Sequence, residues 1–131
     1  MLKIAIVGTG KMGSLIKETA QNQGMEVVHC FEKGIDDYCM DVDVVIDFSH
    51  PNNLASVLNF VKTKKCALIY GTTGLSENQI DILKQVSDEI PLFYSANFSY
   101  GIAVFEQILK QFAPLLKNDF DMEVQEIHHN Q

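Results

Sequence analysis

A glycine-rich turn near the N-terminus has the residue pattern with the clearest chemical meaning. An apolar run ends at Val7, and the hexapeptide GTGKMG follows it directly. In a G-x-G-x-x-G turn the first glycine permits a tight bend, the second lets the backbone approach a pyrophosphate, and the third allows a helix to pack closely on the strand. The amides at the start of that helix would face the negative charge. The pattern predicts dinucleotide binding by the whole turn, which comprises Gly8, Thr9, Gly10, Lys11, Met12 and Gly13; an ordinary strand-to-helix turn is the alternative.

An acidic residue follows at the distance that a dinucleotide site requires. Glu32 lies 19 residues after Gly13, just past a second apolar run. A carboxylate at this place can accept hydrogen bonds from ribose hydroxyls. Lys33 and Lys11 offer positive charge to a 2′-phosphate, without the paired donors of an arginine. We therefore expect NADH, NADPH or both to bind, with a preference for NADH; a solvated ion pair is the alternative for Glu32 and Lys33.

Three further loops follow apolar runs and carry polar groups. They are Asp47–Pro51, Gly71–Gly74 and a run that contains Ser95, Ala96, Asn97 and Phe98. Ligands of open α/β sheets bind outside the carboxyl ends of the strands, so these loops should face the same crevice as the glycine turn. We expect Gly71, Thr72 and Thr73 to bind ribose and the nicotinamide carboxamide. Ser95–Phe98 are expected to hold the nicotinamide ring, with ordinary turn chemistry as the alternative.

The chain has four histidines, two of them adjacent near the C-terminus. His29 lies inside a predicted strand and is interpreted as structural. His50 precedes a proline at a predicted helix start and is interpreted as a surface or capping residue. His128 and His129 would point to opposite faces of a strand, so at most one faces a given site unless the chain turns there. Because no third ligand stands at a suitable spacing, no metal site is predicted.

The elements that position these residues alternate between strand and helix. Continuous apolar runs at 2–7, 25–30, 42–48, 66–70 and 91–94 are typical of strands buried on both faces of a parallel sheet. Apolar positions with the helical period lie between them, and Ser76 and Gln79 have the capping-box spacing. A last helix is expected over residues 100–116, with inward side chains Phe105, Ile108, Leu109 and Phe112. This order predicts a Rossmann-type doubly wound α/β sheet.

The pattern changes after residue 118. Apolar and polar side chains alternate from Phe120 to Gln125, which is the period of a strand with one face in water. We expect a dinucleotide-binding Rossmann domain over residues 1–118. Residues 119–131 are expected to begin the sheet of a second, α+β domain, of which the rest is absent.

Composition restricts the class of protein. Of the 131 residues 47% are hydrophobic, the formal net charge is −7 and no residue is arginine. Binding of nucleic acid needs clustered positive charge, so it is not expected. No apolar run is long enough to span a bilayer and no leader pattern precedes the first strand, so we expect a cytoplasmic protein. The three cysteines are odd in number and are interpreted as reduced.

Taken together, five motifs resemble the 4-hydroxy-tetrahydrodipicolinate reductase family in order and spacing, over the whole chain. They are Gly8–Gly13, Asp47–Ser49, Gly71–Gly74, Ser95–Ser99 and Glu126–His129. The resemblance implies a homotetrameric NAD(P)H-dependent reductase of lysine and diaminopimelate biosynthesis, which gives a hydride to a cyclic unsaturated dicarboxylate. It also implies that the domain beginning at residue 119 binds substrate and forms the tetramer. The lack of an arginine near the glycine turn departs from the family and argues against a strong preference for NADPH.

The resemblance also assigns roles to the histidine pair. In the family's His-His-x-x-Lys motif the first histidine and the lysine donate protons and the second histidine helps to bind substrate, and these histidines match His128 and His129. The lysine would fall one residue beyond Gln131, so we expect this chain to bind dinucleotide with little or no turnover. Two other functions remain open: another Rossmann oxidoreductase, such as an aspartate dehydrogenase-like enzyme, and a non-catalytic NAD(P)-binding regulatory module.

Overall fold

The chain folds into two compact units, with the division between Ala96 and Asn97. The computed structural model describes residues 1–36 and 39–127. The division precedes the domain boundary predicted after residue 118, so the last helix belongs to the second unit. That predicted boundary stays a prediction, and the two units are described separately below.

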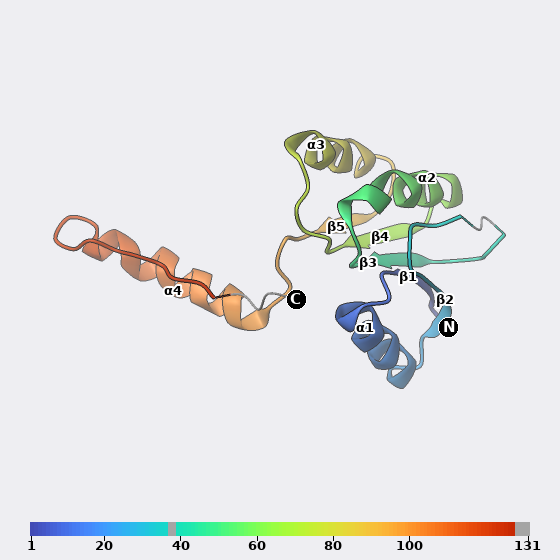
Figure 1. Cartoon of the computed structure of the whole chain (residues 1–131), viewed down its shortest axis with the longest axis horizontal. Helices are drawn as coiled ribbons and strands as arrows, with labels where there is room; N and C mark the ends of the chain where they lie inside the picture. Colours follow the sequence, from blue (N-terminus) through green and yellow to red (C-terminus); the bar gives the residue numbers. More distant parts are fainter. Residues whose placement is uncertain (37–38, 128–131) are drawn as a thin grey trace. The chain divides into compact units, whose positions relative to one another are not determined.

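The first unit is built on a five-stranded parallel sheet (Figure 1). The strands are β1 (Lys3–Val7), β2 (Glu26–Phe31), β3 (Val44–Asp47), β4 (Ala67–Tyr70) and β5 (Leu92–Tyr94). They lie in the order β2-β1-β3-β4-β5. The five apolar runs therefore form the predicted strands, and the direction of strand addition reverses between β1 and β3. In open α/β sheets this reversal is where a ligand crevice opens.

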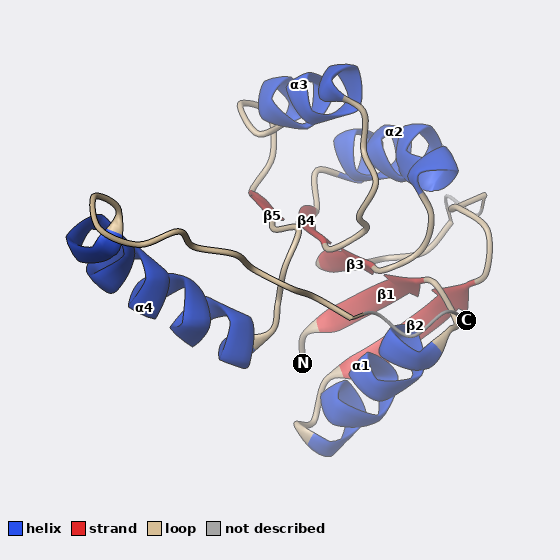
Figure 2. Ribbon diagram, turned by 60° about the vertical axis from the view of Figure 1, so that its left-hand side comes forward, coloured by secondary structure: helices blue, strands red, loops and turns tan. Residues whose placement is uncertain are grey.

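Helices cover both faces of the sheet, as Figure 2 shows. Helix α1 (Lys11–Asn22) lies on one face, and α2 (Leu54–Lys64) and α3 (Glu77–Val86) lie on the other, with the short 3-10 helix η1 (Pro51–Asn53) before α2. The buried side chains accordingly form two clusters. One joins Ile4 and Ile6 of β1 to Ala20 of α1, and the larger one joins the opposite face to α2 and α3. The doubly wound α/β fold is confirmed.

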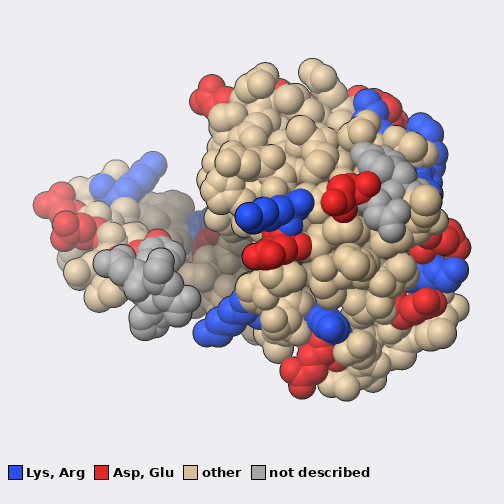
Figure 3. Space-filling view, turned by 45° about the vertical axis from the view of Figure 1, so that its right-hand side comes forward, with Lys and Arg blue, Asp and Glu red and all other residues tan. Residues whose placement is uncertain are grey.

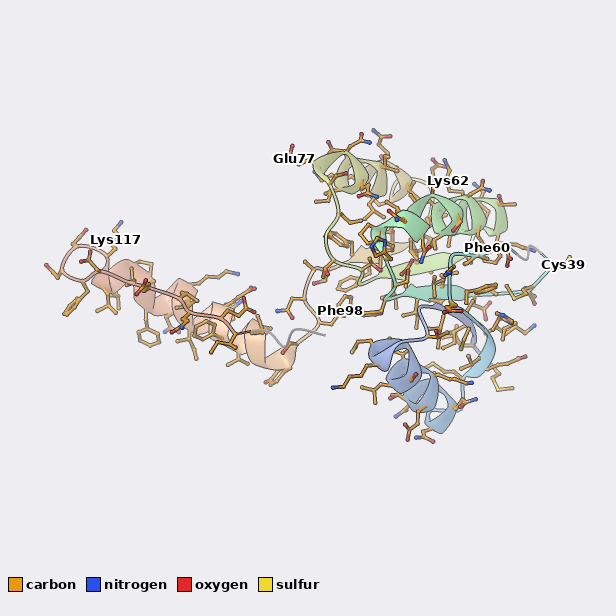
Figure 4. All side chains as sticks on the ribbon, in the orientation of Figure 1. Cys39, Phe60, Lys62, Glu77, Phe98 and Lys117 are labelled. Atoms are coloured by element: carbon orange, nitrogen blue, oxygen red, sulfur yellow. The ribbon has the colours of Figure 1, made fainter. Side chains whose placement is uncertain are left out.

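Helix α2 shows how the helices are fixed on the sheet. Phe60 is fully buried in the larger cluster, whereas Lys62 on the same helix is partly exposed (Figure 4). The Nζ atom of Lys62 lies 2.9 Å from Oε1 of Glu89, just beyond α3. An exposed ion pair adds little stability, so burial of the apolar face holds this helix in place.

The capping box predicted for α3 is confirmed. The backbone amide of Gln79 donates to Oγ of Ser76 at 3.3 Å, and the backbone amide of Ser76 donates to Oε1 of Gln79 at 3.0 Å. Two backbone donors at the helix start are thereby satisfied. The Gln79 side chain also donates to the carbonyl of Pro51 at 3.2 Å, which ties the start of α3 to η1.

The second unit contains helix α4 (Tyr100–Leu116), which confirms the predicted helix but not its buried face. Phe105, Ile108 and Phe112 are between 45% and 49% exposed, and Leu109 is partly exposed. The prediction that these side chains point into a core is wrong for the structure described. Among residues 97–127 no other helix or strand exists on which this face could pack.

The strand predicted from the alternation after residue 118 is not formed. Residues 120–127 carry no regular secondary structure, and Phe120, Met122 and Val124 are all more than half exposed. A strand needs a partner for its backbone hydrogen bonds, and none of the described strands pairs with this segment. Within the described ranges, none of the helices has the length and apolar character needed to cross a bilayer.

Candidate functional site

A cleft of about 640 Å³ opens at the carboxyl ends of β1, β2 and β3, where the strand order reverses. The glycine turn, the end of β2 and the loop after β3 all contribute to it. Its lining residues are Gly8, Thr9, Gly10, Glu32, Lys33, Phe48, Ser49, His50, Asn52 and Asn53. Sequence reasoning placed the first five of these residues in a site, and the fold brings them together.

The glycine turn adopts the conformation that its sequence demands. Gly8 has a φ of +102°, and its amide donates to the carbonyl of Phe31 at 2.8 Å. A Cβ atom at Gly8 would overlap the backbone carbonyl of Phe48, and one at Gly13 would overlap the carbonyl oxygen of Gly8. Only glycine fits either position. The turn can therefore contact the backbone of Phe48 after β3 on one side and the start of α1 on the other.

The start of α1 is open to an anion. Gly10 is the N-cap residue and provides no side-chain cap, and the first turn of the helix holds no acidic residue. Apart from Gly10 and its two chain neighbours, no atom of the described residues lies within 4 Å of the position that a Cβ on Gly10 would take. Lys11 and Met12 are exposed in the same turn. Unsatisfied amides with a positive helix end and free space beside them suit a phosphate group.

Two side chains of opposite charge enter the cleft after β2. Glu32 and Lys33 are both exposed and both line the cleft. On the face shown in Figure 3, lysine and acidic side chains are likewise interspersed. The carboxylate can accept hydrogen bonds from neutral hydroxyls and repels an anion, whereas the ammonium group attracts one.

The loop after β3 was predicted to face the crevice without a binding role for any of its residues, and Phe48, Ser49 and His50 do line the cleft and form its wall. Nδ1 of His50 accepts a hydrogen bond from the backbone amide of Asn52 at 3.2 Å and so caps η1. The capping interpretation of His50 is confirmed, and the same residue also lines the cleft. Its place directly after a strand is the signal by which the loop was predicted to face the crevice.

Beneath this wall lies a buried carboxylate. Asp47 is fully buried, and its Oδ1 accepts hydrogen bonds from the Ser49 amide at 2.9 Å, from Oγ of Ser49 at 2.7 Å and from Oγ1 of Thr72 at 2.7 Å. Burial raises the pKa of Asp47 above its ordinary value, and the hydrogen bonds from Ser49 and Thr72 oppose that change. Burial, together with the neighbouring carboxylate, also raises the pKa of Tyr70.

The other predicted cofactor residues do not line this cleft. Thr72 is buried, and its hydroxyl is engaged with Asp47, whereas Thr73 is exposed. Gly71 lies against the ring of Phe48, which does line the cleft. The Ser95 amide donates to the carbonyl of Tyr70 at 3.3 Å, so the chain after β5 stays beside the end of β4.

The remaining predicted residues belong to the second unit or lie outside the described residues. Ala96 is exposed at the end of the first unit. Asn97 and Phe98 begin the second unit, where Oδ1 of Asn97 accepts from the Ser99 amide at 2.8 Å. His128 and His129 lie outside the described residues.

Comparison with known proteins gives a consistent result. The family model for dihydrodipicolinate reductase, N-terminus, matches residues 2–98. Proteins named 4-hydroxy-tetrahydrodipicolinate reductase are similar to this chain in Clostridium tetani (36% identical, 100% of this chain and 57% of the relative), Exiguobacterium sp. (38%, 98% and 54%) and Alkaliphilus oremlandii (41%, 92% and 52%). The chain spans about half the length of these curated relatives.

Proposed function

The chain belongs to the dihydrodipicolinate reductase family, and we propose that its cleft binds NADH or NADPH as the hydride donor of a reductase. The observation that carries the proposal is the convergence of the glycine turn, the open start of α1 and Glu32 on one cleft at the reversal of strand order. Gly10, at the phosphate-binding turn, and Glu32, whose carboxylate can accept hydrogen bonds from ribose hydroxyls, line the same cleft. One dinucleotide can therefore meet both groups.

Each end of the cleft has a separate role in this proposal. The amides of the glycine turn hold the pyrophosphate, with no side chain in the way at Gly10. Glu32 accepts hydrogen bonds from the ribose hydroxyls and disfavours the 2′-phosphate of NADPH, which Lys33 and Lys11 partly offset. The proposal assigns the nicotinamide half of the dinucleotide to Gly71–Thr73, Ser95 and Ala96 of the first unit. When bound, the dinucleotide supplies the hydride.

The finer parts of the function rest on family membership. We propose that the whole protein reduces 4-hydroxy-tetrahydrodipicolinate in lysine and diaminopimelate biosynthesis, as a cytoplasmic homotetramer. His128 donates a proton to the reduced substrate and His129 helps to bind it, because hydride addition to a conjugated system creates negative charge that a positioned acid can neutralise.

Dinucleotide binding can be tested with a glycine that has room for a methyl group. We expect NADH to bind the wild-type chain and Gly10→Ala to weaken it at least about tenfold, since the added Cβ occupies the space of the approaching phosphate. Thr63→Ala on the exposed side of α2 is the control. Titration calorimetry gives the affinity and thermal unfolding checks the fold. Absence of NADH and NADPH binding by the wild-type chain would refute the proposal.

The reaction is tested in the whole protein, by the substrate dependence of NADH oxidation. Oxidation that requires the cyclic dicarboxylate supports the reductase. Oxidation with the imino acid of aspartate in its place would instead favour an aspartate dehydrogenase-like enzyme.

A further inference from the structure

A buried acidic side chain lies directly behind the cleft wall. Asp47 ends β3 and pairs in register with Val7 of β1 and Tyr70 of β4. Its side chain is fully buried and does not line the cleft. Burial of a carboxylate at the end of the central strand costs free energy unless hydrogen bonds within the protein replace those to water. The partners of this carboxylate therefore indicate what it does for the fold.

The partners come from two loops that are separated in sequence. Oδ1 of Asp47 accepts two hydrogen bonds from Ser49, in the loop after β3, and one from Thr72, in the loop after β4. The two loops are also joined directly, because Oγ1 of Thr72 accepts from the Ser49 amide at 2.8 Å. Oγ of Ser49 in turn accepts from Nδ2 of Asn53 at 2.9 Å. One network thus runs from the end of β4 to η1.

The same two loops interlock with the glycine turn. The backbone carbonyl of Phe48 lies where a Cβ on Gly8 would be, and the Phe48 ring lies where a Cβ on Gly71 would be. Phe48, Ser49 and Asn53 all line the cleft. A change in the position of Ser49 would therefore move the cleft wall and the backbone that confines Gly8 at the same time.

We propose that Asp47 is a positioning residue for dinucleotide binding, which holds the loops after β3 and β4 so that the cleft wall fits against the glycine turn. It acts through Ser49 and Thr72 and does not touch the ligand. The inference rests on the proposed dinucleotide site and adds a residue to the machinery of that site. One oxygen of Asp47 accepts all three hydrogen bonds from the two loops, so any weakening of this acceptor loosens both loops together.

Asp47→Asn tests the proposal with minimal change in shape. Its amide oxygen can accept the same three hydrogen bonds, more weakly, so the fold should persist while the affinity for NADH falls about tenfold or more, because small displacements in a binding site are costly. Asp43→Asn is the matched control, because it makes the same chemical change at the other end of β3. Asp43 is exposed, does not line the cleft, and its Oδ2 accepts a hydrogen bond from the Lys3 backbone amide at 2.8 Å. This variant should bind NADH as the wild type does.

A second variant approaches the network from the other loop. Thr72→Val keeps the shape of the side chain and removes the hydroxyl that donates to Asp47. We expect a similar loss of NADH affinity, and the double variant Asp47→Asn with Thr72→Val should bind little more weakly than either single variant, because both changes break one network. Thermal unfolding of each variant separates affinity from stability.

The outcomes distinguish this inference from the function on which it rests. If the wild-type chain binds neither NADH nor NADPH, the proposed function fails and the inference fails with it. If the wild-type chain binds NADH and the folded variants Asp47→Asn and Thr72→Val bind it equally well, the dinucleotide site stands and the positioning role of Asp47 is wrong. The same holds if Asp43→Asn loses as much affinity as Asp47→Asn.

Discussion

Replacement of Glu32 by glutamine should change which dinucleotide the cleft prefers. Glu32 is exposed and lines the cleft next to Lys33. In the proposed site its carboxylate faces the ribose, where NADPH carries a phosphate and NADH carries a hydroxyl. The variant Glu32→Gln removes the negative charge and leaves Lys33 to attract the phosphate.

The size of the effect follows from the exposure of the side chain. Because Glu32 is in contact with water, two unit charges about 4 Å apart repel by about 1 kcal/mol. A phosphate with nearly two charges doubles this value, and salt at about 0.1 M reduces the sum to roughly 1.4 kcal/mol. Glu32→Gln should therefore bind NADPH about tenfold more tightly. NADH should bind several-fold more weakly, because its ribose loses a charged hydrogen-bond acceptor.

Titration calorimetry with both dinucleotides at two salt concentrations checks this prediction. The gain for NADPH should shrink as salt rises, which a change in shape would not cause. Glu18→Gln is the control, because Glu18 is exposed on α1, does not line the cleft, and its loss changes the net charge equally. If NADPH affinity is the same in Glu32→Gln and the wild type, the placement of Glu32 at the ribose is wrong.

Three further predictions concern Asp47, the cysteines and Ser76. Burial raises the pKa of Asp47 above the ordinary 3.8. The stability of the wild type relative to Asp47→Asn should therefore be greatest below pH 3.8 and fall as pH rises through the folded-state pKa of Asp47. Urea unfolding from about pH 3 to about pH 8 measures this difference, and a rise of stability with pH contradicts the prediction. Burial also raises the pKa of the Cys66 thiol, so Cys66 should react slowly with a thiol reagent, whereas the exposed Cys39 should react rapidly. Mass spectrometry measures the two labelling rates, and equal rates would contradict this prediction. Ser76→Ala should lower the free energy of unfolding by about 1 kcal/mol without changing NADH affinity, and an unchanged free energy would exclude a stabilising cap.

The strands and helices of the first unit and the conformation of the glycine turn could be predicted from the sequence. Continuous apolar runs mark β1 to β5 because a strand buried on both faces leaves little room for polar side chains. The glycine turn could be predicted because its constraints are local: Gly8 needs a positive φ, and Gly13 must approach the carbonyl of Gly8, five residues earlier. The capping box of α3 is equally local, since its two partners stand three residues apart.

The sequence predicted that the loops after β3 and β4 face one crevice, but only the tertiary structure decided which of their side chains bond to each other. Asp47 and Thr72 are 25 residues apart, and nothing near either residue in the sequence indicates that the two side chains are paired. Helix α4 gives the converse case, since its period predicted a helix correctly but could not supply a partner for its apolar face. Local sterics and hydrogen bonds determine a turn or a helix, whereas contacts between loops depend on which strands become neighbours, and the packing of the whole sheet determines that order.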